Sequence, residues 1–240
     1  MTKEGKVVKA KYNKFRQINK YLELLKTSLD ILPTDRPLKI VDFGCGKAYL
    51  TFALYYYVVK ILGRQADITG LDLKEDVIDY CNKIAKDLNY TSLEFQKGDI
   101  KDYDRTQDVD MVIMLHACDN ATDEGIVQSL RFNAKIIIAV PCCQHEFFKQ
   151  IGNENLQPML QFGILKERFS ALATDSLRAQ ILKALGFDVS VMEFIDTEHT
   201  PKNIAIRAIR NGGASYAAFR DYLNLTPYIE RRLREENILK

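Results

Sequence analysis

The sequence predicts an α/β fold with a mostly parallel sheet of seven strands, helices on both faces and an antiparallel hairpin at its C-terminal end. Between residues 38 and 140, short apolar segments alternate with segments of helical periodicity, which indicates strands joined by crossover helices. The strands are apolar almost throughout, as expected for a parallel sheet covered on both faces. Segments 188–195 and 203–210 follow one another with no helix between them, so we expect them to pair antiparallel.

Apolar positions spaced by three and four predict a first helix over residues 11–31, which Pro33 and Pro37 bring to an end. The strands before the hairpin are expected at 38–43, 66–73, 92–100, 110–118 and 134–140. The helices between them are expected at 50–61, 76–88 and 122–132. Strand and helix alternate along this whole region, so right-handed crossovers fix most of the topology.

Three parts are expected along the chain: a basic N-terminal helical extension, the α/β domain and a helical tail, over residues 1–36, 37–212 and 213–240. Within the domain, residues 141–186 are expected to form an insert over the active site. The insert is expected to end in a helix over 175–185, with Gly186 as its stop. In the tail, three arginines are expected in solvent: Arg231, Arg232 and Arg234.

Charge and composition favour a protein that neither spans a membrane nor depends on disulfide bonds. The net charge is only +2, yet the first 20 residues hold seven basic side chains and a single acid, Glu4. Such a run either follows a nucleic-acid backbone or forms a solvated helix face. The chain shows no secretory signal and no apolar run long enough to span a bilayer. Five cysteines in 240 residues show no disulfide framework, so we expect reduced thiols and a cytoplasmic protein. We expect no stable protein partner, and the sequence leaves the oligomeric state open.

The segment IVDFGCGKAYL (40–50) reads as a strand, a glycine turn and the start of a helix. A phosphate-binding loop would need a hydroxyl residue where Ala48 stands. A dinucleotide fingerprint would need a third glycine where Tyr49 stands. The remaining interpretation is S-adenosylmethionine, which has no pyrophosphate and whose methionine end would lie over Gly44 and Gly46.

Three acids stand at three successive strand ends, where ligands of such sheets bind. Asp42 ends the first strand and is placed to accept the amino group of S-adenosylmethionine. Asp72 ends the second strand, where an acid would accept the two ribose hydroxyls. Asp99 follows the third strand, where it would meet the adenine amino group while Ile100 packs on the ring.

Thiols, imidazoles and an acid follow the fourth and fifth strands, which are neighbours in this topology. They are His116, Cys118 and Asp119 after the fourth strand, and Cys142, Cys143 and His145 after the fifth. Three interpretations stay open: a metal site, a nucleophilic Cys142, or an acceptor pocket in which Asp119, His116 or His145 takes a proton. The pocket is favoured and no metal is expected, because this spacing is not one that zinc sites use.

Two basic residues in the expected insert, Arg168 and Arg178, have two possible roles. They would either meet phosphate groups of a substrate or pair with Asp175 and fix the insert in place. The residue pattern leaves both alternatives open.

At LHACDNATD (115–123) and CCQH (142–145) the sequence resembles a family of class I methyltransferases. Members of that family share a K-x-x-Q-I helix, a D-F-G-C-G-K turn and these two segments; the helix motif stands here at Lys14–Ile18. Distant relatives include tRNA ribose 2′-O-methyltransferases that act on the acceptor stem. The resemblance implies a Rossmann-like fold, S-adenosylmethionine binding, and Lys14 and Gln17 folding over the carboxylate end of the cofactor. Many members carry more chain before this helix, so we expect that an N-terminal region is missing here.

These observations predict an S-adenosylmethionine-dependent methyltransferase that acts on RNA, with a small-molecule or protein methyltransferase, or an inactive cofactor-binding module, as alternatives. The expected catalytic residues are His116, Asp119, Cys142 and His145. The expected cofactor-binding residues are Lys14, Gln17, Asp42, Gly44, Cys45, Gly46, Asp72, Leu73, Asp99, Ile100, Leu115 and His116.

Overall fold

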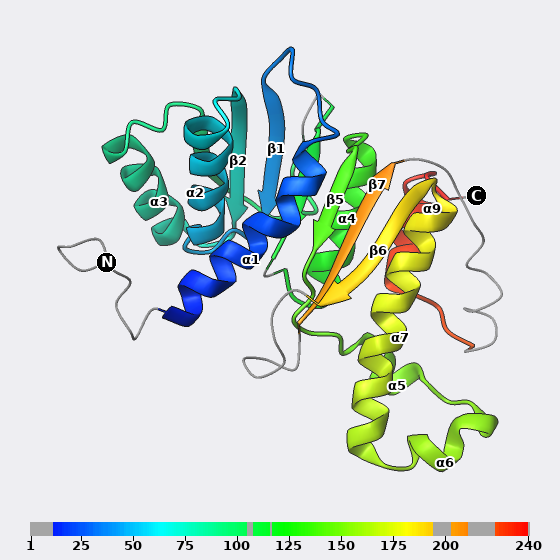
Figure 1. Ribbon diagram of the computed structural model, residues 1–240. Helices are drawn as coiled ribbons and strands as arrows, with labels where there is room; N and C mark the ends of the chain where they lie inside the picture. The colour runs from blue at the N-terminus through cyan, green and yellow to red at the C-terminus, as the bar shows by residue number, and fades with distance from the viewer. Residues whose placement is uncertain (1–11, 105–107, 116, 194–202, 211–223, 240) are drawn as a thin grey trace.

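The structure is a computed structural model that describes residues 12–104, 108–115, 117–193, 203–210 and 224–239. A single twisted sheet forms its centre, with helices on both faces and a helical arm that extends beyond one end of the strands (Figure 1). The expected α/β class is confirmed.

The sheet has seven strands in the order β3-β2-β1-β4-β5-β7-β6. Their bounds are β1 Leu38–Phe43, β2 Ala66–Asp72, β3 Leu93–Lys97, β4 Met111–Met114, β5 Ile136–Ala139, β6 Phe187–Glu193 and β7 Ile204–Arg210. Strands β1 to β5 run parallel, whereas β7 pairs antiparallel with both β5 and β6. The order reverses between β1 and β4, so the carboxyl ends of these strands form the edge at which ligands of such sheets bind.

The side chains of the central strands point alternately to the two faces of the sheet, so the core consists of two clusters. In β5, Ile136 and Ile138 belong to one cluster and Ile137 to the other, because successive side chains of a strand point to opposite faces. One face is covered by α1 Tyr12–Leu29, α2 Tyr49–Tyr55 and α3 Glu75–Asp87, and the other by α4 Asn120–Arg131, α7 Gly163–Ala184 and α9 Tyr228–Glu235. None of the described helices is long and apolar enough to cross a membrane.

The first helix is part of this core. Tyr21, Leu25 and Leu29 of α1 are fully buried in the cluster that also contains β1 and β2 side chains. The helix after β1 continues from α2 into a π-helical turn, η2 Tyr56–Ile61. It ends before Gly63, which takes a φ of 64°, a conformation that glycine adopts without steric cost.

Two strands are shorter than the sequence predicts. We expected strands over 92–100 and 110–118, but β3 ends at Lys97 and β4 at Met114. Asp99 accepts a hydrogen bond from the backbone amide of Lys101 (3.0 Å), which turns the chain after β3. After β4, Leu115, Ala117 and Cys118 lie outside the strand and belong to the loop that leads into α4.

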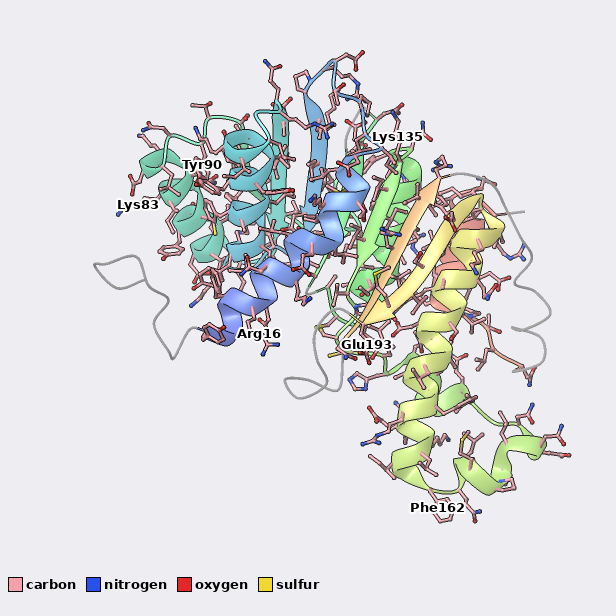
Figure 2. The ribbon with its side chains drawn as sticks, in the orientation of Figure 1. Arg16, Lys83, Tyr90, Lys135, Phe162 and Glu193 are labelled. Atoms are coloured by element: carbon pink, nitrogen blue, oxygen red, sulfur yellow. The ribbon has the colours of Figure 1, made fainter. Side chains whose placement is uncertain are left out.

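The segment 141–186 is an arm followed by a crossover helix. The arm consists of α5 Glu146–Gln150, η3 Glu154–Leu156, α6 Gln157–Leu160 and the first half of α7. It extends beyond the carboxyl ends of the strands, with Phe162 at its far end (Figures 1 and 2). The second half of α7 contributes Leu177, Ile181 and Leu182 to the core. The predicted helix over 175–185 is therefore the end of a longer helix, and this part covers the sheet.

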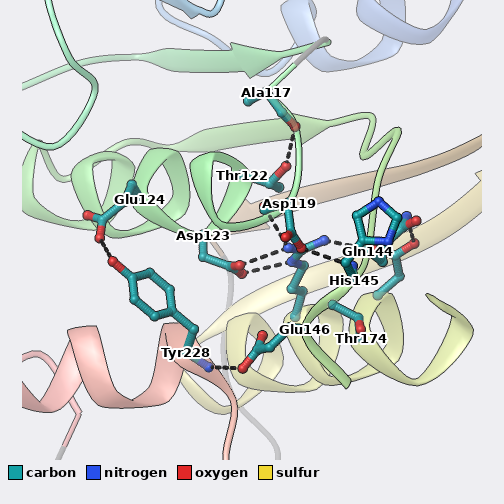
Figure 3. A network of polar contacts seen from close by, with 12 residues as sticks. Ala117, Asp119, Thr122, Asp123, Glu124, Gln144, His145, Glu146, Thr174 and Tyr228 are labelled. Carbon is teal, nitrogen blue, oxygen red and sulfur yellow. Dashed lines mark hydrogen bonds and ion pairs between the residues drawn. The ribbon is translucent and has the colours of Figure 1, made fainter. Parts of the chain in front are cut away.

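The C-terminal helix α9 buries one of its arginines. The Nε atom of Arg232 donates to Glu124 of α4 at 2.8 Å, and Arg232 is only 9% exposed. The expectation that the tail arginines lie in solvent is thus wrong for Arg232, whereas Arg231 and Arg234 are exposed. Tyr228 adds a hydrogen bond from its hydroxyl to Glu124, which fixes α9 to α4 (Figure 3).

A buried guanidinium joins α7 to the start of α4. Arg178 is 1% exposed; its Nε and Nη2 atoms each donate to Asp123 at 2.8 Å, and its Nη1 donates to Asp175 at 3.1 Å. Its Nη2 also donates to the backbone oxygen of Asp119 at 2.9 Å. Asp175 in turn accepts from the side chain of Gln144 at 2.7 Å, in the loop after β5 (Figure 3). Of the two roles left open for Arg178, phosphate binding is wrong, because its donors are buried and engaged within the protein.

We predict that Arg178→Met destabilises the protein by about 3–5 kcal/mol, because Asp123 and Asp175 then stay buried without their cation. Chemical denaturation measured by circular dichroism at pH 8 checks this value. Burial already raises the pKa of Asp175 to about 6, and loss of the guanidinium raises it further. The two carboxyls therefore take up protons in the folded variant as the pH falls, so the deficit should shrink at pH 5.

Arg168→Met on the same helix is the matched control. Arg168 is exposed, and a surface substitution of this kind changes stability by less than about 0.5 kcal/mol. A loss below about 1 kcal/mol for Arg178→Met would contradict the structural role assigned to Arg178.

Candidate active site

The loop between β1 and α2 is held against β2 by backbone hydrogen bonds. The amides of Gly44 and Cys45 both donate to the oxygen of Leu71, at 2.9 and 3.0 Å. Gly44 and Gly46 take φ angles of 71° and 52°, and no atom lies within 4 Å of the position a Cβ would take on Gly46. Glycine is therefore required at position 46 by the backbone conformation and not by crowding.

The carboxylate of Asp72 fixes this turn at the end of β2. Its Oδ2 atom accepts from the amide of Gly46 at 3.0 Å, and its Oδ1 accepts from the amide of Lys74 at 3.1 Å. Each carboxylate oxygen can accept more than one hydrogen bond, so Asp72 keeps acceptor capacity for the hydroxyl groups of a ligand.

A cavity of about 290 Å³ opens beside the turn. Five of the predicted cofactor-binding residues line it: Asp42, Gly44, Cys45, Gly46 and Leu115. Four further lining residues were not predicted: Lys47, Ala48, Tyr49 and Leu50. They directly follow the glycine turn and begin α2, so the helix start in the sequence was the signal that could have identified them.

The other predicted cofactor residues lie outside this lining. Asp72 contacts the turn by accepting a hydrogen bond from the amide of Gly46. Leu73 is 65% exposed. Asp99 is exposed, and Ile100 is half-buried. Gln17 is half-buried on α1. The side chain of Lys14 and all of His116 lie outside the described residues, so their expected roles stay predictions.

Asp42 is a buried carboxyl group at the base of the cavity. It is 2% exposed, and its Oδ2 accepts a hydrogen bond from the hydroxyl of Thr51 at 2.5 Å. Burial raises the pKa of Asp42 to about 7, against the opposing effect of Thr51 and with a smaller contribution from the charge of Asp72. Asp42 therefore changes its charge near neutral pH, and a nearby cation would favour its ionised form.

The loops after β4 and β5 are joined through Asp119. Its amide donates to the oxygen of Cys143 at 3.1 Å, and its Oδ1 accepts from the amide of His145 at 3.1 Å (Figure 3). Asp119 has a φ of 51° and a ψ of −124°, and a positive φ is uncommon for residues other than glycine. Two of the predicted catalytic residues, Asp119 and His145, are thus joined by a hydrogen bond that uses the backbone of His145 and not its imidazole.

Cysteine side chains gather on the same two loops. The Sγ atoms of Cys118 and Cys142 lie 2.7 Å apart, and the sulfurs of Cys118, Cys142 and Cys143 all lie within 4.8 Å of one another. None of the five cysteines of the chain forms a disulfide. Burial, together with the neighbouring thiols, raises the pKa of Cys142 to about 12. A nucleophilic cysteine needs a lowered pKa, so the arrangement disfavours Cys142 as the attacking group.

Comparison with known proteins agrees with this geometry. Residues 13–150, more than half of the chain, match a family described as a methyltransferase domain. No curated protein matches the sequence.

Solved structures share the fold at low sequence identity. The citrinin polyketide synthase CMeT domain gives a TM-score of 0.55 at 17% identity over 81% of this chain and 52% of that one. Magnesium protoporphyrin IX methyltransferase (ChlM) from Synechocystis PCC 6803, solved with bound SAM, gives 0.52 at 16% identity over 86% of both chains. The chain thus spans about half the length of the polyketide synthase structure.

Sheet order, glycine turn and family match lead to one assignment. The chain belongs to the methyltransferase-domain family and is a class I methyltransferase that uses S-adenosylmethionine.

Proposed function

We propose that this methyltransferase transfers the methyl group of S-adenosylmethionine to RNA. The methionine end of the cofactor lies over the turn at Gly44 and Gly46, with its ammonium group against Asp42. The ribose hydroxyls bind Asp72, and the adenine lies near Asp99 and Ile100. Support for this placement comes from the cavity beside the turn and from the two backbone amides that orient the Asp72 carboxylate.

The distribution of positive charge is the main observation that supports RNA as the methyl acceptor. Seven basic side chains stand among the first 20 residues, and the described, exposed ones include Arg16 and Lys20 on α1. Arg16 lies near the carboxyl ends of the strands, on the side of the sheet edge where the arm also extends (Figure 2). A phosphate backbone that crosses this edge would meet Arg16 close to the cofactor. The sequence likeness to tRNA ribose 2′-O-methyltransferases points to the same class of acceptor.

Chemistry at the acceptor side would consist mainly of positioning. The attacking atom must be in line with the bond between the methyl carbon and the sulfonium sulfur, and holding it there supplies much of the rate enhancement. A ribose hydroxyl must also lose a proton. Asp119 and His145, held together at the ends of β4 and β5, are the described candidates for that base, and His116 is a further candidate from the sequence.

A small or protein acceptor is the second candidate. The arm exposes large apolar side chains: Phe148, Phe162, Ile164, Leu165 and Leu172. Such a surface suits an apolar substrate better than a phosphate backbone. The protoporphyrin methyltransferase of similar fold acts on a small molecule by its name.

We predict that affinity for S-adenosylmethionine depends on the protonation of Asp42. The raised pKa of about 7 leaves the carboxyl mostly neutral at pH 5.5, and the cofactor ammonium then has no anionic partner. An α-amino group stays largely protonated up to about pH 7.7. Calorimetric titration should therefore give binding about tenfold weaker at pH 5.5 than at pH 7.0.

Asp42→Asn provides the control for that titration. The variant should bind the cofactor more weakly at pH 7.0 and show little change between the two pH values. A pH dependence that is the same in the Asp42→Asn variant and in the native protein would rule out Asp42 as the partner of the ammonium group.

We predict that Arg16→Glu combined with Lys20→Glu weakens binding of total tRNA at least about tenfold and reduces the salt dependence of the binding constant. Lys83→Glu combined with Lys86→Glu is the matched control, since these lysines lie on α3, away from α1 (Figure 2). Fluorescence anisotropy measures the binding, and transfer of a radiolabelled methyl group measures the reaction. Label that enters only protein or small-molecule fractions would contradict RNA as the acceptor.

A further inference from the structure

Three cysteine sulfurs from two separate loops meet at the carboxyl edge of the sheet. Cys118 comes from the loop after β4, and Cys142 and Cys143 come from the loop after β5. Their sulfurs all lie within 4.8 Å of one another, with Cys118 exposed and the other two half-buried. Within the described parts of the chain, this is the one group of three or more histidine, cysteine or acidic side chains with metal-site spacing.

The sulfur spacing suits a shared cation. Zinc binds thiolate sulfur at about 2.3 Å in tetrahedral geometry, which places sulfurs of one site about 3.8 Å apart. The Cys118–Cys142 distance of 2.7 Å and the upper limit of 4.8 Å lie on either side of that value. Small rotations of the side chains would therefore bring all three sulfurs onto one zinc ion. Thiols are weak hydrogen-bond partners, so contacts among them do not account for their gathering.

The protein holds the two loops in place by contacts other than the thiols. The amide of Asp119, next to Cys118, donates to the backbone oxygen of Cys143 at 3.1 Å. The amide of His145 donates to the Asp119 carboxylate at 3.1 Å, and Gln144 is fixed to Asp175 at 2.7 Å. The backbone that carries the sulfurs is thus positioned before any ligand binds, which favours affinity.

We propose that Cys118, Cys142 and Cys143 bind a thiophilic divalent cation, represented by zinc. Three protein ligands leave the fourth tetrahedral position for water or another ligand, as in catalytic rather than structural zinc sites. The site lies at the ends of β4 and β5, on the loop that begins at Leu115, which lines the cofactor cavity. The sequence spacing disfavoured a metal here, but the sulfurs come together from two loops, so spacing along the chain is no guide. This inference rests on the positions of the three sulfurs and does not depend on the acceptor being RNA.

Metal binding can be measured without any methyl acceptor. The full chain is purified with a reductant, freed of metal, and titrated with cobalt and then zinc under anaerobic conditions. We expect one cobalt ion per chain with a thiolate-to-cobalt charge-transfer absorption, and displacement of cobalt by zinc. Cys118→Ala, Cys142→Ala and Cys143→Ala should each weaken binding at least about a hundredfold.

Cys81→Ala is the matched control, because Cys81 lies on α3, away from the cluster. It should bind cobalt as the native chain does, and circular dichroism shows whether each variant is folded. The proposal is overturned if the reduced native chain binds no cobalt or zinc at micromolar concentrations. It is also overturned if binding survives all three substitutions. Cofactor titration on the same samples reports separately on the methyltransferase site.

Discussion

The ion pairs of the buried Arg178 guanidinium are the interactions on which the loops after β4 and β5 depend. The guanidinium makes two hydrogen bonds to Asp123 and reaches the backbone of Asp119, while its partner Asp175 holds Gln144. Through these contacts two paired side chains of α7, Arg178 and Asp175, position the loops after β4 and β5. The cost of burying the charges is offset only while all the partners are present, so the loops, the Asp119–His145 contact and the cysteine cluster form one coupled unit.

The two halves of the site are built in different ways. On the donor side, backbone geometry dominates: glycines at positive φ and amides aimed at Asp72 form a surface that needs few side chains. At the loops after β4 and β5, which carry the proposed acceptor site, charged and thiol side chains form a network instead. Donor binding can therefore be inferred from the fold and the family, whereas the acceptor depends on side chains that vary freely on the same fold.

Patterns local in sequence predicted most of the fold and five of the residues that line the cavity. Apolar runs and helical periodicity identified the seven strands, and the glycine spacing identified the turn that lines the cavity. The misses depend on contacts between distant residues. Glu124, the partner of Arg232, is 108 positions away, so the burial of Arg232 could not be inferred from its neighbours. For Arg178, pairing with Asp175 was one of the two expected roles and is confirmed, whereas its contact with Asp123, 55 positions away, was not predicted. The strands β3 and β4 end earlier than the sequence predicts. Apolar residues continue beyond β4 at Leu115 and Ala117, whereas β3 is followed by Gly98 and by the turn at Asp99.

Titration calorimetry of S-adenosylmethionine into the native chain and into the Asp72→Ala variant is the sharpest test of the donor site. We expect one cofactor per chain at micromolar affinity in the native protein, since Asp72 orients the glycine turn and is the residue proposed to accept the ribose hydroxyls. In the variant, affinity should fall by at least about tenfold, the equivalent of about 1.4 kcal/mol. Equal affinity in the two proteins, or no binding to the native chain, would contradict the assignment of this turn as the donor site.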